Sequence, residues 1–455
     1  MTEMRTEFIK EAKKGMADTV LRQQMQSYLS QYQHAFQKSV RQFAHLDLAK
    51  MRAARLRWRT INHLDKYLIE LESNFIKSGA KVIWAQDMEE ASLEIINILK
   101  KNNSHTVTTC TDSISEELSI GNLLKQEQWQ LIETNYSHLI RRSAGELVPS
   151  FSATNSTEIS YRLKEALQQS GLQEKNDPEK IALFIRENLR KEFTLANASI
   201  TTAQFLAADP GAVIISDNDG AALLTAGMPR INIVLAPIDR IVPSLPEIEL
   251  LLSLFSTYND GKPQHTYSTI ITGPRTANDK DGPEELYIVL IDNGRSNVLA
   301  YEPQRKILSC INCNACLPAS AIYKTVGGKS FPGPAKAISV PLAFGAEKYK
   351  YLADLATMDG SGSETCPVKI SFPRLTLENR RLFVKQGHGT RLERWFYFAW
   401  KKTMLNRNLL SWTGIDARKK VMEAYFKKSS EQLRSWPDQP VKFFNQRWRE
   451  KTGSR

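Results

Sequence analysis

A chain of 455 residues is long enough for two or three domains, and 42% hydrophobic with 24% charged residues is ordinary for a soluble globular protein. The longest apolar runs, such as Ile231–Pro237, fall far short of the ~18 residues that a membrane helix needs. Residues 1–16 mix Glu and Lys and have no apolar centre, which excludes a typical signal peptide and predicts a cytoplasmic protein. The net charge of +12 belongs to the tail, because residues 380–455 hold 19 Lys and Arg against 6 Asp and Glu.

The first 75 residues have the apolar spacing of helices, as at Leu29, Phe36 and Phe43. Gln, Lys and Arg separate these apolar positions. This mixture favours a helical arm over residues 1–55 that packs on the rest of the protein, rather than a membrane-bound or calmodulin-binding helix.

Short apolar strands alternate with amphipathic helices from residue 56 to residue 300. The alternation predicts an α/β domain with a largely parallel sheet. We expect helices over Met88–Leu99 and around Lys180–Leu189, with others between the strands. The predicted strands are Lys81–Ala85, Thr106–Thr109, Gln130–Glu133, Ala212–Ser216, Ile231–Leu235 and Tyr287–Asp292.

Periodicity weakens between residues 301 and 379, where Gly, Pro and Cys concentrate. We expect little regular structure there, and a segment of that kind needs a metal centre or a similar support in place of a large core. After residue 380 the helical spacing returns, which predicts a helical tail over 380–455.

Four of the five cysteines form a C-x2-C-x2-C run and a distant Cys-Pro pair: Cys310, Cys313, Cys316 and Cys366-Pro367. Such a run wraps three corners of a cubane iron–sulfur cluster, and in bacterial ferredoxin-type folds a remote Cys-Pro supplies another ligand. The same four thiolates could hold zinc, although structural zinc sites more often use two C-x2-C pairs. Four buried cysteines without a ligand are the third alternative. Cys110 stands alone and is expected to be a small buried hydrophobe.

No other pattern predicts a catalytic residue. The sequence has no Ser–His–Asp arrangement, nucleotide-binding fingerprint or pair of acids typical of a self-sufficient enzyme. Asp217-Asn218-Asp219-Gly220 lacks the rest of a calcium loop, so a solvated turn is favoured there.

The tail interleaves aromatic with basic residues, as at Trp395, Phe398, Trp400, Lys401 and Lys402. Such a tail could pack its aromatic side chains on the body. It could equally dock on an acidic redox partner or on an anionic membrane surface. Nucleic acid is disfavoured, because no recognised binding module accompanies the charge.

Short matches in a fixed order connect residues 50–380 to one family. Besides the cysteine run, they are His63-Leu64-Asp65, Trp84-Ala85, Gly273-Pro274-Arg275, Asp281–Leu286, Asp292–Arg295, Pro332-Gly333-Pro334 and Cys366–Ile370. In these residues the chain resembles the lactate utilization protein B family of iron–sulfur electron-transfer proteins, which carry a LUD domain.

The resemblance implies an electron-transfer subunit of a system that oxidises L-lactate to pyruvate. Its partners would be a second iron–sulfur protein with cysteine-rich repeats and a small separate LUD protein. The LUD domain, over residues 56–300, would be a parallel sheet with helices, similar to ribose-phosphate isomerases and CoA transferases. A ferredoxin-like [4Fe–4S] module would occupy 301–379.

This sequence departs from the family pattern, which usually supplies ligands for two clusters. Ser320 stands in place of the fourth cysteine of the first motif, and Asp359 and Gly362 replace two cysteines of the later one. All three positions would belong to the second cluster. Cys310, Cys313, Cys316 and Cys366 would therefore hold one [4Fe–4S] cluster, with the second cluster lost.

The LUD part departs from the family at Thr108–Ser113, Ser199–Phe205 and Ser216–Gly220, where ligand-binding segments are expected. Three functional hypotheses follow. The leading one is an electron-transfer subunit with one cluster. The others are a non-redox scaffold with a four-cysteine zinc site or no metal, and an enzyme that uses the LUD pocket on a small phosphorylated or CoA-linked molecule.

Overall fold

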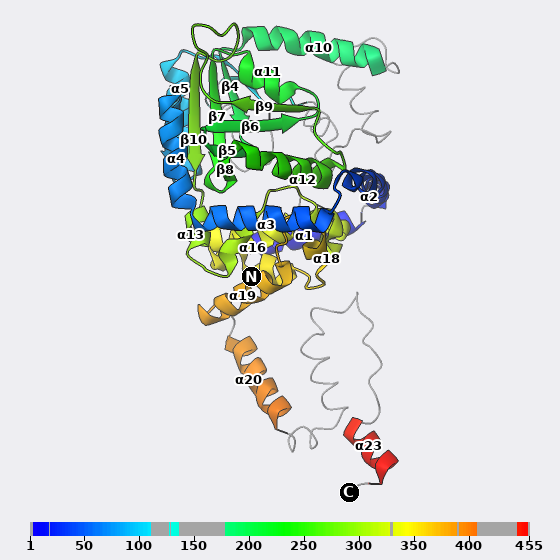
Figure 1. Ribbon diagram of the computed structural model, residues 1–455. Coiled ribbons are helices and arrows are strands. Elements are labelled where there is room, and N and C mark those ends of the chain that lie inside the picture. The colour runs from blue at the N-terminus through cyan, green and yellow to red at the C-terminus, as the bar shows by residue number, and fades with distance from the viewer. Residues whose placement is uncertain are drawn as a thin grey trace. The chain divides into compact units, whose positions relative to one another are not determined.

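The computed structural model describes residues 3–17, 19–110, 127, 129–135, 178–327, 331–388, 391–406 and 444–453 (Figure 1). The chain divides into two compact units, Met1–Leu382 and Phe383–Arg455. The helices predicted between the second and third strands lie outside the described residues.

Four helices open the first unit, as the spacing of apolar residues predicts: α1 (Glu3–Ala17), α2 (Thr19–Ser39), α3 (Leu46–Asn62) and α4 (Leu64–Lys77). Helix α1 contacts α15 (Ala321–Val326), and α2 contacts α12 (Ile248–Asp260). The approach of α1 is close, because a Cβ atom on Gly15 would lie 2.8 Å from the Val326 carbonyl oxygen. The N-terminal helices therefore pack on the body, as expected.

The main sheet has six strands, and every neighbouring pair is parallel. This confirms an α/β class with a parallel sheet. In spatial order the strands are β1 (Lys81–Ala85), β10 (Glu285–Ile291), β7 (Ile231–Pro237), β4 (Ala198–Thr202), β2 (Thr106–Thr109) and β3 (Gln130–Glu133).

Both faces of this sheet are buried, which explains the continuous apolar runs of its central strands. On β7, Ile233 and Leu235 face the cluster that includes α5 (Met88–Lys101), while Val234 and Ala236 face the opposite cluster. Successive side chains of a strand point to opposite faces, so one apolar strand supplies two cores.

A second sheet of four strands has the order β8 (Ile241–Ser244), β5 (Phe205–Asp209), β6 (Ala212–Asp217) and β9 (Tyr267–Ile271). The strand predicted at Ala212–Ser216 is therefore correct, but its membership of the parallel sheet is wrong. Only Pro210 and Gly211 separate β5 from β6, and Gly211 has a φ of +87°. So short a turn allows only antiparallel pairing with β5, because a parallel partner needs a long crossover.

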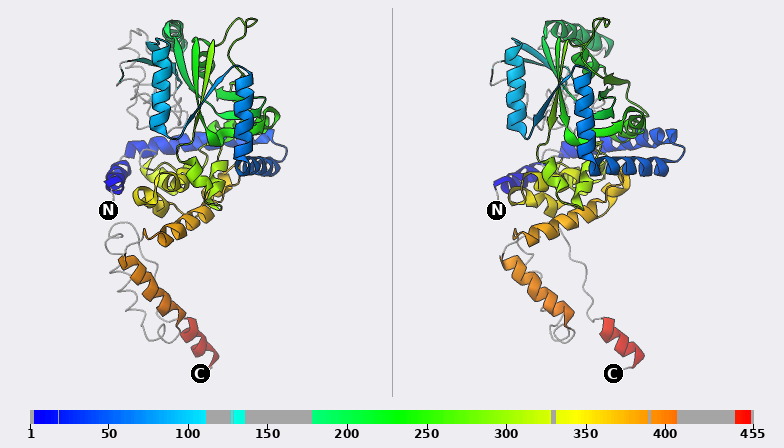
Figure 2. Two further views of the ribbon diagram at one scale, coloured as in Figure 1. Left: turned by 90° about the vertical axis from the view of Figure 1, so that its left-hand side faces the viewer. Right: turned by 60° about the vertical axis from the view of Figure 1, so that its left-hand side comes forward.

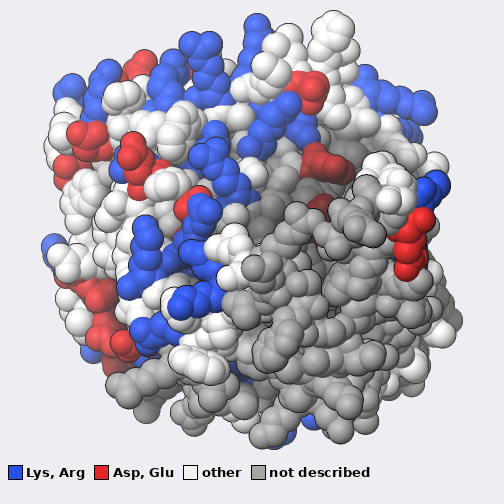
Figure 3. Space-filling view, turned by 90° about the horizontal axis from the view of Figure 1, so that it is seen from below, with Lys and Arg blue, Asp and Glu red and all other residues white. Residues whose placement is uncertain are grey.

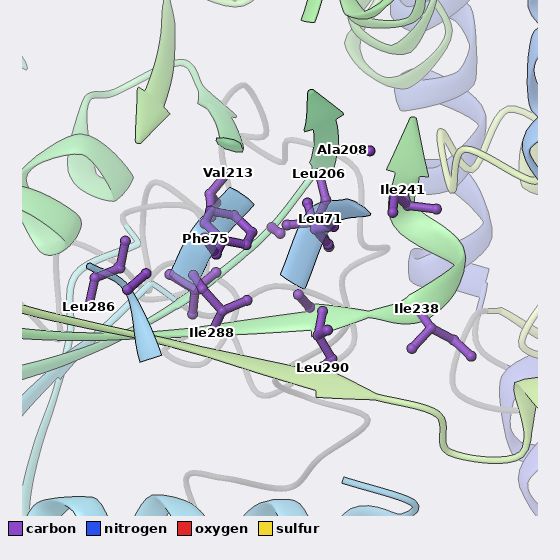
Figure 4. Close-up of a cluster of buried hydrophobic side chains, with 14 of the residues drawn as sticks. Leu71, Phe75, Leu206, Ala208, Val213, Ile238, Ile241, Leu286, Ile288 and Leu290 are labelled. Atoms are coloured by element: carbon purple, nitrogen blue, oxygen red, sulfur yellow. The ribbon is translucent and has the colours of Figure 1, made fainter. Parts of the chain in front are cut away.

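Helix α4 fills the space between the two sheets. Figure 4 shows its Leu71 and Phe75 among Leu206, Val213 and Leu290 from both sheets. Leu71 and Phe75 are wholly buried. The sequence positions in this cluster run from 64 to 290, so the α/β core closes only when distant segments meet.

The segment after the α/β core is helical, and the expectation of little regular structure there is wrong. Its elements are η4 (Gln304–Ser309), α14 (Cys316–Ala319), α15, α16 (Pro334–Phe344), α17 (Ala346–Leu355), α18 (Ser361–Thr365) and α19 (Phe372–Lys385). Glycines 327, 345 and 360 separate several of these helices. Helices this short carry too few turns to show a clear period in the sequence.

Helix α3 lies between the α/β core and these cysteine-bearing helices (Figures 1 and 2). It contacts η4 on one side and β8 and α12 on the other. The ferredoxin-like architecture expected for 301–379 stays a prediction.

In the second unit, α20 (Arg391–Leu405) and α23 (Phe444–Thr452) confirm helical structure for the described part of the tail. Phe396 stacks on Trp400 with ring centroids 6.3 Å apart, while Trp395 is 74% exposed. In Figure 3, which draws the whole chain, Lys and Arg side chains are interspersed with fewer Asp and Glu side chains over the described surface. Across the described ranges, no helix combines the length and apolar character needed to cross a membrane.

Candidate functional site

Two separate segments carry the four cysteines of the motif. Cys310 follows η4, Cys313 lies in the loop, Cys316 begins α14, and Cys366 follows α18. The two segments meet where Ser361 Oγ donates a 3.1 Å hydrogen bond to the carbonyl oxygen of Ala319. Contact between α14 and α18 therefore brings the distant Cys366 to the first three.

Asparagines shape the cysteine loop. Asn312 and Asn314 have φ angles of 53° and 57°, in the left-handed region that asparagine tolerates better than most residues. Each lies between two cysteines of the run. Two left-handed residues make the chain curl, so the three thiols can approach one centre.

Cys313 and Cys366 are buried, Cys310 and Cys316 are half-buried, and the four thiols interact electrostatically in every pair. Burial, followed by the neighbouring Cys366, raises the pKa of Cys310 to about 11. Burial also raises the pKa of Cys313, Cys316 and Cys366. Near neutral pH the metal-free thiols therefore keep their protons, and a bound metal would have to displace them.

Backbone N–H groups point at the sulfur atoms. The N–H of Asn312 donates to Cys310 Sγ at 3.3 Å, and that of Ile370 donates to Cys366 Sγ at 3.4 Å. The N–H groups of Ala315 and Ala335 also hold down the pKa of Cys313 and Cys316, against the larger effect of burial. Such donors stabilise negative charge on sulfur and set the potential of iron–sulfur clusters.

Among the described residues, no three His, Cys, Asp or Glu side chains are grouped as they would be around a bound metal ion. The fit of the cysteines to a metal centre therefore rests on their number, their burial and their mutual coupling. Thiolate ligands suit both zinc and iron–sulfur clusters.

Comparison with known proteins decides the family. Residues 68–291 match the LUD domain family. Lactate utilization protein B of Shouchella clausii is 32% identical over 395 residues, which are 85% of this chain and 82% of that protein. The chain belongs to the lactate utilization protein B family. The Bacillus subtilis protein of the same name is 34% identical over 344 residues, 73% of this chain and 71% of that one.

Two further comparisons gave weaker similarity. An uncharacterized electron transport protein of Escherichia coli, YkgF, is 28% identical over 85% of this chain and 82% of its own. Against the crystal structure of a DUF162 family protein from Deinococcus radiodurans, the TM-score is 0.30 with 14% identity, covering 50% of this chain and 98% of that chain. Membership of the lactate utilization protein B family rests on the sequence matches.

In this family member, the three positions without cysteine have other partners. Ser320 Oγ accepts the N–H of Tyr323 at 3.4 Å and caps α15. Asp359 Oδ1 accepts the N–H of Ser361 at 3.0 Å at the start of α18. A Cβ atom on Gly362 would lie 3.2 Å from the ring of Phe372. Caps and packing therefore occupy the positions that the resemblance assigns to a second cluster.

The LUD segments expected to bind a ligand have structural partners. Thr201 Oγ1 donates to Asn232 Oδ1 at 2.9 Å between neighbouring strands, and Asp217 Oδ2 accepts the N–H of Ala222 at 2.7 Å. The Asp217–Gly220 segment is thus a turn that leads into α11 (Ala221–Gly227), as expected. Cys110 packs partly buried against the core between the sheets, and Thr111–Ser113 lies outside the described residues.

A serine, a histidine and an aspartate lie in hydrogen-bonding contact, although no sequence pattern predicted it. Ser216 Oγ lies 3.0 Å from His265 Nδ1, and His265 Nε2 lies 2.9 Å from Asp260 Oδ2. In a catalytic triad the aspartate takes Nδ1 and the serine takes Nε2, so the ring is reversed here. Asp260 also accepts bonds from Asn218 and Asn259. This set links β6 to the end of α12.

Sequence reasoning missed the basic side chains that approach the cysteine segments. Lys50 Nζ donates to the Glu364 carbonyl oxygen at 2.7 Å, and Arg57 donates to the carbonyl oxygens of Leu308 and Ser309. Both basic residues are buried on α3. Their spacing of seven residues, which places them on one face of a helix, is the signal that could have found them.

Proposed function

We propose that this chain is an iron–sulfur electron-transfer subunit of a system that oxidises L-lactate or a related 2-hydroxy acid. Cys310, Cys313, Cys316 and Cys366 would hold one [4Fe–4S] cluster. The observation that carries the proposal is the contact between α14 and α18, which brings Cys366 close enough to the other three thiols for all four to interact electrostatically.

A bound cluster would supply a one-electron redox centre. The chain's own part is to bind and insulate that centre. Loop 310–316 and Cys366 offer thiolates, and the backbone N–H groups of Asn312 and Ile370 donate to two sulfurs. Cys313 and Cys366 are buried, which shields that part of the centre from water. No described residue needs to touch an organic substrate in this role.

The names of the relatives support the biological setting. Several are lactate utilization protein B, and YkgF is described as an electron transport protein. The partners would be a second iron–sulfur protein with cysteine-rich repeats and a small LUD protein. The basic aromatic tail would dock on an acidic partner or on an anionic membrane surface. A reducing cytoplasm suits the described cysteines, which form no disulfide.

Anaerobic purification, a visible spectrum and counts of iron and sulfide per chain test the proposal. Broad charge-transfer absorption with about four iron atoms would support one cluster. About eight iron atoms would contradict the assignment of a single cluster. A colourless protein with zinc, or with no metal, would overturn electron transfer and favour the non-redox scaffold.

Cysteine variants identify the ligands. Cys366→Ser should remove most of the iron and the visible absorption, because it deletes the ligand from the second segment. Cys110→Ser is the matched control, since Cys110 lies on the α/β core, and its iron content should equal that of the wild type. Equal iron loss in both variants would contradict the ligand assignment.

A further inference from the structure

Basic side chains reach both cysteine segments from one face of α3. Lys50 is 9% exposed and donates to the Glu364 carbonyl, two residues before Cys366. Burial lowers the pKa of Lys50, and the neighbouring Cys366 opposes that shift. A cationic nitrogen therefore sits beside the segment that delivers the fourth cysteine.

Arg57 lies two turns further along α3 and has no exposed surface. Its guanidinium donates to four carbonyl oxygens: those of Asp239, Ile241 at 2.5 Å, Leu308 at 3.1 Å and Ser309 at 3.3 Å. Among the described ion pairs, none joins Arg57 to a carboxylate, while the nearby Asp239 carboxylate pairs with Arg295 at 2.7 Å. The carbonyl dipoles therefore stabilise the charge of Arg57, and no described carboxylate forms an ion pair with it.

Arg240 approaches the loop from the α/β side and is 3% exposed. Its Nη1 lies 3.5 Å from the carbonyl oxygen of Gln204, whose side chain in turn donates to the Ile311 carbonyl at 3.5 Å. Its Nε is buried and has no hydrogen-bond partner among the described residues. Arg240 also interacts electrostatically with Cys310.

The balance of charge here is positive. The Asp239 carboxylate pairs with Arg295 and is also the acid that acts on Arg57, near which Arg240 is a second cation. Lys50 adds a cation at the other cysteine segment, where Lys369 and Asp47 pair with each other. Buried charge is unfavourable unless an opposite charge compensates it. Thiolates bound to a metal centre would supply compensating negative charge.

We infer that Lys50, Arg57 and Arg240 form a buried cationic cradle for the metal–thiolate centre, which favours its reduced state. The inference rests on the proposed function. Reduction adds one negative charge to the centre. Because the surroundings are poor in water, nearby cations stabilise that added charge more strongly than they would in solution. The three residues are positioning residues, since they act on the centre through space and through its carbonyl neighbours.

Replacing Lys50 with Gln in the full-length, iron-loaded protein tests the inference. The variant removes one charge and keeps a hydrogen-bond donor for the Glu364 carbonyl. We expect the equilibrium between the reduced and oxidised centre to shift tenfold toward the oxidised form. For a one-electron couple this shift equals a midpoint potential about 59 mV more negative. A redox titration followed by the visible spectrum measures it without any assay of activity.

Arg52→Gln is the matched control, because it removes the same charge from the exposed side of α3. Arg240→Gln tests the other side of the loop and leaves the Glu364 contact intact. We expect it to lower the potential as Lys50→Gln does. If both variants keep the potential of Arg52→Gln, the inference is overturned while the proposed function stands. A wild-type protein without an iron–sulfur centre would overturn both.

Discussion

The α/β core and the cysteine-bearing helices of the first unit are held together in different ways. The core buries wholly enclosed side chains such as Leu71, Ile233 and Leu290 on both faces of one sheet. The helices after residue 301 share a smaller apolar cluster that includes Tyr323 and Phe331. Ala12 of α1 packs into the same cluster. This region also holds four thiols, two of them buried, and three buried cations lie beside it.

This difference in apolar burial indicates which region depends on a bound metal for its stability. A sheet packed on both faces gains enough from apolar burial to be stable without a ligand. Short helices around polar groups gain less, and buried charges without counter-ions reduce the gain further. We therefore expect the α/β core to be stable without metal and the cysteine region to depend on it.

The largest expected effect comes from breaking the core. Phe75→Ala removes a wholly buried ring from between the two sheets and should lower the free energy of unfolding by about 3–5 kcal/mol. Urea unfolding followed by circular dichroism measures it. Ile76→Ala is the control on the same helix, because Ile76 is 59% exposed and its loss should change stability by less than about 0.5 kcal/mol. Equal losses would contradict the assignment of the core.

Metal removal should separate the two regions. In the chelated protein, we expect the backbone amides of α14 and α18 to exchange hydrogen at least about tenfold faster, because the thiols no longer bridge the two segments. Amides of β7 and β10 should keep their protection. Hydrogen exchange with mass spectrometry gives both results in one experiment. Faster exchange in the sheet as well would mean that the two regions unfold together.

Two helical glycines differ in the space around them: a Cβ atom would meet another residue at Gly15 and no atom at Gly227. Gly15→Ala places a Cβ atom 2.8 Å from the Val326 backbone oxygen and should push α1 away, lowering stability by about 1–2 kcal/mol. Gly227→Ala has no atom within 4 Å of the new Cβ and should raise stability by about 0.5–1 kcal/mol. Thermal unfolding of the two variants measures the contrast. Stabilisation by both would show that α1 does not pack closely on α15.

The smallest expected effect is a pH dependence in the α/β core. Burial raises the pKa of Asp217 from 3.8 to about 6, so the folded protein holds this proton more tightly than the unfolded chain does. The stability contribution is then present below pH ~4 and lost as pH rises through 6. Between pH 4 and pH 7, the free energy of unfolding of Asp217→Asn should rise by about 1 kcal/mol relative to that of the wild type. This figure is reduced because Asp217 is partly exposed.

Urea unfolding at the two pH values measures this gain, with Asp279→Asn as the control. Hydrogen bonds from the Thr276 backbone and side chain lower the pKa of the exposed Asp279. The stability contribution of Asp279 is therefore lost as pH falls, whereas that of Asp217 is lost as pH rises. The same pH trend in both variants would contradict the burial of Asp217.

Local pattern was enough for much of the fold. The sequence predicts β2 and β3 at their observed bounds and the helices that precede the sheet, because periodicity records which face of an element is apolar. It did not predict β5 or the antiparallel pairing of β6, which depend on a two-residue turn and on partners far along the chain. It also missed the short helices around the cysteines.

For the candidate site, the spacing of Cys310, Cys313, Cys316 and Cys366 identified the thiols, and short matches over residues 50–380 identified the family. Only the tertiary structure decided what surrounds them. Lys50 and Arg57 come from α3 and Arg240 from the 3-10 helix Ile238–Arg240, more than 60 residues away from the cysteines in sequence. The cysteines can be recognised in the sequence because three of them lie in one short run and the fourth is followed by proline. The burial and charge that act on those ligands arise only when distant segments pack together, since electrostatic energy depends on distance in space.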